Sequence, residues 1–343
     1  MEAIRFLGRA ATALALAGLG TVCAAQEKIV LKVADRYPAG HFIPEYATKF
    51  WMDGVTKATN GQVTFQYFPG QQLGKPQDML SLTATGVADV GEVIPSMVSE
   101  KLPLSTVAEL PGLFSSSCEG GLAAFSLMRP GGAVDKAEFQ AAGVRMLFML
   151  VLPPYQLYTK TPIDGLASLK GLKVRSAGPG MDLTIRGLGA VPIRIGATEV
   201  HEALSRGTID GSIYPAASVL QYDLTPFLKG ATAKENFGSV VISYTISERR
   251  WRQLPPNVQK ALADVGEEAT RRTCKLLDGD DDSATRNIQG KGVALARFSD
   301  ADRAQMSSAM TPVAQEWATG MDKRGKAGSD TLKAFRAAIA AAR

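Results

Sequence analysis

The chain has 343 residues, of which 45% are hydrophobic and 21% are charged, and its formal net charge is +5. This length allows two domains of roughly 100–200 residues each, and the composition is that of a soluble globular protein rather than a fibrous or disordered one. Lys and Arg are scattered among Asp and Glu instead of forming a basic patch, which argues against a nucleic-acid partner.

The first 25 residues have the pattern of an export signal. Arg5 and Arg9 supply positive charge, and an apolar run from Ala10 to Val22 follows. This run is shorter than the roughly 20 apolar residues that a membrane-spanning helix needs. We therefore expect an exported protein that is cleaved near Ala25. Lipidation of Cys23 is the alternative, and the bulky valine before it argues against that alternative.

Cleavage leaves two cysteines, Cys118 and Cys274. An oxidising compartment allows them to form a disulfide. Two buried free thiols fit the sequence equally well, because the spacing alone does not show whether the two residues meet.

The N-terminal part alternates strand and helix patterns. Strands are predicted over residues 28–35, 63–68 and 87–94, and helices over 41–59 and 76–85. The order β-α-β-α-β predicts a parallel sheet that is covered on both faces.

A similar pattern returns later in the chain. Strands are predicted over 172–174, 191–195 and 209–214, with helices over 181–188 and from a Thr198 cap to residue 206. Both halves contain a Gly, an acidic residue, a strand and a Pro in the same order, at 86–95 and 207–215. We therefore expect an α/β protein with two lobes and a cleft between them, although helix–Gly–strand units recur in every α/β protein.

The part of the chain after Phe237 is predicted to be mainly helical. A helix over 255–277 is followed by a solvated acidic loop at 278–282, a strand over 293–298 and further helix from 301. We expect residues 26–152 to form lobe I, completed by segments from 238–343. Residues 153–237 would form lobe II, and 238–343 would brace both lobes.

The sequence contains no complete catalytic or metal-binding motif of the common kinds. It lacks His-Glu-x-x-His, Cys-x-x-Cys and Gly-x-Ser-x-Gly. Three aspartates at 278, 280 and 282 match the first ligands of a calcium loop, but Ser283 and Gln289 replace its Gly and Glu. We expect no cofactor, no metal site and no enzymatic activity; a dyad of scattered carboxylates is the one catalytic arrangement that sequence does not exclude.

Arg175 is the strongest candidate for ligand binding. It ends a predicted strand and precedes a Gly-rich turn and a helix that begins near Met181. Ligands of open α/β sheets bind outside the carboxyl ends of the strands. An Arg there can hold a carboxylate with two parallel N–H···O bonds, and the helix N-terminus favours the same charge. The alternative is a surface or structural ion pair.

Several short motifs follow one another in a fixed order. They are FPGQQLG at 68–74, LPGLF at 110–114, L-x-x-L-K-G-L-K-x-R at 166–175, TEV at 198–200, Asp-Gly at 210–211 before Pro215, and Leu-Pro at 254–255. This ordered set resembles the solute-binding proteins of TRAP (tripartite ATP-independent periplasmic) transporters over essentially the whole mature chain.

The resemblance implies a periplasmic protein whose two lobes close by hinge motion on a small organic acid. It implies delivery of that acid to membrane permease subunits, and it places the family's carboxylate-binding Arg at Arg175. A sensor-associated receptor and a carboxylate-acting lyase are the alternatives.

Three positions depart from well-known members of the family. Tyr155 stands where a second Arg is common, Tyr214 where an Asn is common, and Ala197 where an aromatic residue is common. One cation and two phenols predict a monocarboxylate with an aromatic or 2-oxo/hydroxy body, because Tyr rings pack on apolar groups and still offer a hydroxyl. The alternative is that the two tyrosines fill the core.

Three further residues are candidates for the cleft: His41, Gln72 and Ile94. His41 follows the first predicted strand, where the family often contacts solute. Its alternative role is that of a helix cap.

Overall fold

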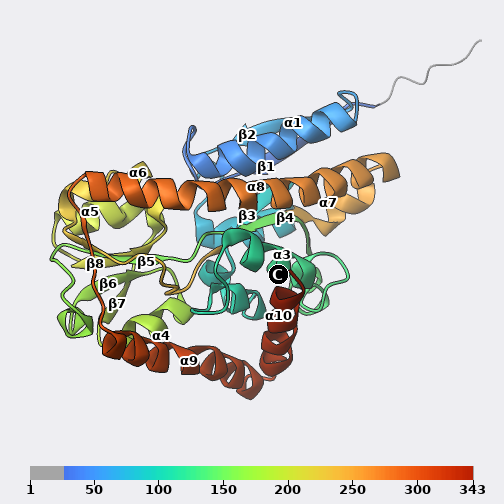
Figure 1. The fold of residues 1–343 in the computed structure, drawn as a ribbon. Helices are drawn as coiled ribbons and strands as arrows, with labels where there is room; N and C mark the ends of the chain where they lie inside the picture. Colours follow the sequence, from blue (N-terminus) through green and yellow to red (C-terminus); the bar gives the residue numbers. More distant parts are fainter. Residues whose placement is uncertain (1–26, 343) are drawn as a thin grey trace, which may run out of the picture.

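The computed structural model describes residues 27–342, so the predicted export signal lies outside the described residues. Within that range no helix has both the length and the apolar character required to cross a bilayer. Two sheets form the centres of two α/β lobes, and long C-terminal helices run along both lobes (Figure 1). The predicted two-lobed α/β architecture is confirmed.

The first sheet has the strand order β2-β1-β3-β10-β4. Its strands are β1 (Ile29–Ala34), β2 (Val63–Phe68), β3 (Val90–Val93), β4 (Val144–Val151) and β10 (Val241–Ser247). Strands β1, β2 and β3 are parallel, as predicted. Strand β10 inserts antiparallel between β3 and β4, with all of its residues buried. The sheet is therefore mixed, and one of its interior strands, β10, comes from the C-terminal half of the chain.

The second sheet has the order β11-β9-β5-β8-β6-β7. Its strands are β5 (Gln156–Thr159), β6 (Lys173–Ser176), β7 (Val191–Arg194), β8 (Gly211–Tyr214), β9 (Gly230–Ala231) and β11 (Ala294–Leu295). Strand β6 runs parallel to both of its neighbours, β7 and β8. The carboxyl end of β6, which carries Arg175, therefore lies in the interior of the sheet and not at its edge.

Two extended segments connect the lobes beside each other. The backbone N–H of Leu152 donates to the carbonyl of Val240 over 3.1 Å, and that of Tyr155 donates to Gly238 over 2.9 Å. These bonds join the link between β4 and β5 to the link between β9 and β10. The crossing is thus a paired two-stranded connection, suited to bending without separating.

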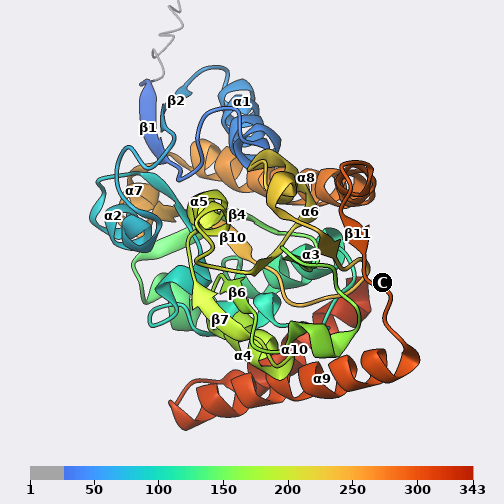
Figure 2. The same cartoon turned by 90° about the vertical axis from the view of Figure 1, so that its left-hand side faces the viewer.

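Among residues 27–342, ten α-helices cover the sheets. They are α1 (Lys49–Ala58), α2 (Met79–Thr85), α3 (Ser117–Met128), α4 (Pro179–Gly187), α5 (Val200–Ser205), α6 (Ala216–Gln221), α7 (Glu248–Gln253), α8 (Pro256–Gly290), α9 (Asp300–Lys323) and α10 (Gly328–Ala342). Helix α8 has 35 residues, a length of about 50 Å. It packs on α1, α3 and β4 of the first lobe and on α6 of the second (Figures 1 and 2). Helix α9 contacts α4 of the second lobe and leads to α10, which packs on α3.

The predicted acidic loop at 278–282 is wrong, because these residues continue α8. Cys274, Leu277, Ala284 and Ile288 are buried at helical spacing on both sides of the acidic stretch. Tertiary packing of this face outweighs the low helix propensity of Asp and Gly. The strand predicted over 293–298 is likewise reduced to β11, and Thr198 lies inside a 3₁₀ turn (Ala197–Glu199) instead of capping the helix.

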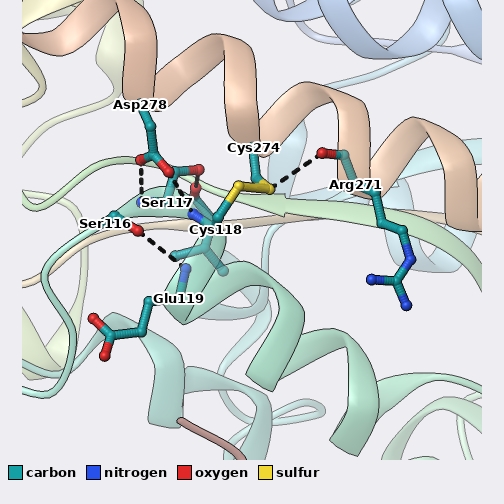
Figure 3. Close-up of a disulfide and its surroundings, with 8 residues drawn as sticks. Ser116, Ser117, Cys118, Glu119, Arg271, Cys274 and Asp278 are labelled. Atoms are coloured by element: carbon teal, nitrogen blue, oxygen red, sulfur yellow. Dashed lines mark hydrogen bonds between the residues drawn. A yellow bond between two sulfur atoms is a disulfide. The ribbon is translucent and has the colours of Figure 1, made fainter. Parts of the chain in front are cut away.

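A disulfide between Cys118 and Cys274 joins α3 to α8, with a Cα–Cα distance of 4.7 Å (Figure 3). This settles the question between a disulfide and free thiols. Next to it, the Asp278 carboxylate accepts the backbone N–H groups of Ser117 (2.6 Å) and Cys118 (3.0 Å) at the start of α3. A carboxylate at this position satisfies orphan N–H groups and complements the helix dipole. Asp278, which resembled a calcium ligand in the sequence, thus belongs to α8 and caps the N-terminus of α3.

Replacing both cysteines (Cys118→Ser with Cys274→Ser) should lower the free energy of unfolding by about 2–5 kcal/mol, because the disulfide closes a long loop in the unfolded chain. Urea unfolding with and without reductant measures this. Reductant should destabilise the wild type to a similar extent and leave the double variant unchanged. Equal stability of the oxidised wild type and the variant would show that the crosslink contributes nothing.

Candidate functional site

A cavity lies where the two lobes meet. From the first lobe and its connections it is lined by Arg36, Tyr37, Ile94, Ser96, Met97, Leu152 and Val240, and from the second by Tyr155, Arg175, Ala177, Ala197, Tyr214, Ser218 and Tyr222. The cavity has a volume of about 20 Å³. Side chains therefore nearly fill the cavity in this arrangement, and a ligand would require them to move apart.

Arg175 is buried in this cavity, with 2% of its surface exposed. Its Nε donates to the carbonyl of Ile195 over 3.0 Å and its Nη1 to the carbonyl of Ile213 over 3.3 Å. The guanidinium carbon lies 4.9 Å from the centre of the Tyr214 ring. None of the ion pairs among residues 27–342 includes Arg175, so the alternative of a structural ion pair does not hold there. A buried cation that has only carbonyl and ring partners favours an anion beside it.

Tyrosines form one wall of the cavity around Arg175. The rings of Tyr155 and Tyr214 meet edge to face at 6.3 Å, and Tyr222 lies 6.0 Å from Tyr214. The Tyr214 hydroxyl donates to the carbonyl of Ala197 over 2.9 Å, whereas the Tyr222 hydroxyl has no hydrogen-bond partner. Burial raises the pKa of Tyr155 and Tyr214, so both present neutral phenols. The wall is therefore aromatic, and the Tyr222 hydroxyl is left without a hydrogen-bond partner among the described residues.

Arg36 is a second guanidinium in the cavity that the sequence analysis missed. It lies two residues after the end of β1, and its Nε lies 3.1 Å from Oε1 of Glu92 on β3. The Glu92 Oε2 also accepts the backbone N–H of Arg36 over 2.9 Å. Unlike Arg175, Arg36 thus has a carboxylate partner. The strand-end rule that pointed to Arg175 applies equally to the end of β1 and would have found it.

The other predicted site residues lie at different distances from the cavity. Ile94 lines it, just before the 3₁₀ turn Pro95–Val98. His41 is buried behind the wall, where it stacks on Tyr37 at 4.1 Å. Its Nδ1 accepts the backbone N–H of Ile43 over 3.2 Å, which is the helix-cap role. Gln72 is exposed and does not line the cavity. The structure thus brings Arg175, Tyr155, Tyr214 and Ile94 together and leaves the other two outside.

Gly178 shows how closely the two lobes approach. It lies in the turn between β6 and α4, and a Cβ atom built on it would be 2.7 Å from the Cβ of Ser96 in the first lobe. Real Cβ contacts are not this short, so only a residue without a side chain fits there. In this structure the two lobes are therefore in close contact beside the cavity.

Residues 34–320 match the family model described as bacterial extracellular solute-binding protein, family 7. The chain belongs to this family, the solute-binding proteins of TRAP transporters. It is 25% identical to the outer membrane transporter protein TsaT of Comamonas testosteroni, covering 99% of this chain and 100% of that protein. It is 26% identical to the C4-dicarboxylate-binding periplasmic protein DctP of Rhodobacter capsulatus, covering 98% of both chains.

Solved structures of TRAP solute-binding proteins share the fold. One from Bordetella bronchiseptica, with bound mandelate, has a TM-score of 0.82 and 24% identity, covering 92% of this chain and 100% of that one. One from Rhodoferax ferrireducens, in complex with benzoate, has a TM-score of 0.83 and 23% identity over 92% and 98%. A marine metagenome protein specific for aromatic acids, with 3-hydroxybenzoate, has a TM-score of 0.85 and 21% identity over 92% and 99%. At these identities the likeness establishes the two-lobed fold.

Within residues 27–342 no group of three or more His, Cys, Asp or Glu side chains is arranged to hold a metal ion. The three aspartates that resembled a calcium loop lie on α8 instead.

Burial of His41, together with the positive charge of Arg36, lowers its pKa from 6.5 to about 3. In the unfolded chain the His41 imidazole therefore takes up a proton near pH 6.5, whereas in the folded protein it takes up that proton only near pH 3. The free energy of unfolding should fall as the pH decreases through this window, by at most about 1.4 kcal/mol per pH unit. His41→Phe, which keeps the ring but cannot take the proton, should flatten that dependence in urea unfolding at pH 7 and pH 5. An identical loss of stability in variant and wild type would contradict this.

Proposed function

We propose that the protein captures a monocarboxylate with an aromatic or 2-oxo/hydroxy body in the interlobe cavity, in the periplasm, and delivers it to the membrane permease subunits of a TRAP importer. The observation that carries the proposal is the buried Arg175 guanidinium, which has no carboxylate partner among the described residues. A ligand carboxylate would supply the missing charge and accept the N–H groups that the two carbonyls leave free.

The character of the rest of the cavity supports a single carboxylate on an aromatic or otherwise flat body. Tyr155, Tyr214 and Ile94 provide ring and apolar surface around Arg175, and the free Tyr222 hydroxyl suits a ligand hydroxyl or oxo group. The other guanidinium, that of Arg36, is paired with Glu92. The related structures with mandelate, benzoate and 3-hydroxybenzoate hold ligands of this kind. DctP, a relative named for C4-dicarboxylates, shows that family membership alone does not choose the class.

The fold and the family support the proposed delivery to a permease. The two lobes are joined by a paired two-stranded crossing, and closing them buries Arg175 together with its ligand. Opening by bending at the crossing would release the ligand beside a membrane partner. A sensor-associated receptor would use the same closure, so transport is tested by uptake of the acid in cells that carry the permease genes.

Arg175→Ala should abolish binding of benzoate and mandelate. The wild type, at 100 times the Kd, should gain about 2.7 kcal/mol of stability from a ligand, visible as a raised melting temperature. Losing the guanidinium should weaken binding by about 2–5 kcal/mol. Arg186→Ala, which removes an exposed Arg from α4, is the matched control and should respond like the wild type.

Three outcomes would contradict the proposal. One is an Arg175→Ala variant stabilised as much as the wild type. Another is a dicarboxylate such as succinate that binds the wild type as tightly as any monocarboxylate. The third is turnover of the bound acid, followed by proton NMR, which would indicate a lyase.

Gly178→Ala should weaken benzoate binding at least tenfold, because the added methyl group collides with Ser96 only when the lobes are closed. The loss should appear mainly as faster dissociation, while the stability of the ligand-free protein changes by less than about 0.5 kcal/mol. Gly180→Ala is the control, since its Cβ would lie at an ordinary 3.4 Å from Leu110. Stopped-flow measurement showing unchanged dissociation for Gly178→Ala would rule out the closed arrangement as the binding form.

A further inference from the structure

We infer that Glu92 is a specificity-determining residue: by pairing with Arg36 it leaves Arg175 as the uncompensated cation of the cavity, and so it selects ligands with one carboxylate over ligands with two. This inference rests on the proposed function. It assigns the choice of ligand class to a residue that does not itself line the cavity.

Glu92 is held firmly behind Arg36. It belongs to β3, between β1 and β10, and its side chain is buried, with 2% of the residue exposed. One carboxylate oxygen accepts the backbone N–H of Arg36 over 2.9 Å and the other lies 3.1 Å from its Nε. The negative charge is therefore fixed by the sheet and cannot turn away when a ligand arrives.

The Arg36 guanidinium faces the cavity with its charge cancelled but with hydrogen-bonding capacity left. Its Nη2 donates to the Tyr37 hydroxyl, and its Nη1 lies 3.9 Å from the sulfur of Met97. The contact with Glu92 is an ion pair without a well-directed hydrogen bond, because neither Arg36 Nε nor Glu92 Oε1 has a hydrogen-bond partner. Only the charge of Glu92 prevents this guanidinium from acting as a second anchor.

The two arginines thus differ in the net charge that they present to a ligand carboxylate. Arg175 is surrounded by carbonyls and a phenol ring, so a carboxylate beside it completes a pair. A second carboxylate near Arg36 would meet a pair with no net charge, and its burial would lack a counter-charge. Glu92→Gln keeps the shape of the side chain and removes the charge, so it should turn Arg36 into an anchor for a second carboxylate.

The experiment compares two ligands that differ only in the charge of one arm, isophthalate and 3-carbamoylbenzoate, by calorimetry. Burial raises the pKa of Glu92 to about 8, so Glu92 cancels the charge of Arg36, and disfavours a second carboxylate, only above this pH. The titrations are therefore made at pH 9, where the Glu92 carboxylate is ionised. The wild type should bind 3-carbamoylbenzoate at least tenfold more tightly than isophthalate. Glu92→Gln should shift this ratio at least tenfold toward isophthalate. Glu138→Gln, which neutralises another buried glutamate of the first lobe, is the control and should keep the wild-type ratio.

A double variant, Glu92→Gln with Arg36→Gln, removes both charges and tests the inference even if Glu92→Gln alone does not fold. It should keep the wild-type ratio of the two affinities, because it replaces an ion pair with no net charge by two neutral glutamines. A changed ratio in the double variant, or an unchanged ratio in folded Glu92→Gln, overturns the inference. Failure of the wild type to bind benzoate and 3-carbamoylbenzoate overturns the proposed function instead, so the two failures are distinguishable.

Discussion

The burial of one guanidinium without a carboxylate partner is the constraint on which the account of this protein depends. Arg175 is removed from water by the closed lobes, and two backbone carbonyls and a phenol ring are its recorded partners. Desolvating a cation in this way is costly unless an anion joins it. The same closure that imposes this cost also strengthens the attraction for a carboxylate, since charges interact more strongly where water is excluded. In the proposed mechanism, binding and closure would thus be favoured together.

The frame around the cavity combines fixed and bending parts. Helix α8 contacts both lobes, and the Cys118–Cys274 disulfide and the Asp278 cap fix it to α3 of the first lobe. The paired crossing at Leu152 and Tyr155 holds the lobes together beside the cavity. In the proposed mechanism, movement of the second lobe would bend this crossing, while the first lobe would keep Arg36 and Glu92 in place.

Local patterns predict much of the first sheet, and they single out Arg175, which the structure places in the cavity. The strand over 63–68 was predicted with the bounds that the structure shows, and Arg175 was found because a strand-end Arg before a helix has a general chemical meaning. Prediction from local patterns failed where contacts between residues far apart in the sequence determine the secondary structure. The acidic stretch of α8 is helical because its buried face packs on other elements, and β10 enters the first sheet from more than a hundred residues away.

Local sequence patterns also do not predict how the charges of the cavity are paired. In the sequence Arg36 looks like any Arg near a strand end. Only the fold reveals that it pairs with Glu92, whereas Arg175 has no carboxylate partner among residues 27–342. The Cys118–Cys274 pairing was equally undecidable, because it depends on where α3 and α8 meet. Types of residue can be read from sequence, but the pairing of charges requires the structure.

The most direct test of the central claim is a crystal structure of the mature protein with bound benzoate. The account predicts closed lobes, with both carboxylate oxygens within hydrogen-bonding distance of the Arg175 guanidinium and the ring against Tyr155 and Tyr214. A benzoate carboxylate bound away from Arg175, with that guanidinium still held only by the carbonyls of Ile195 and Ile213, would contradict it.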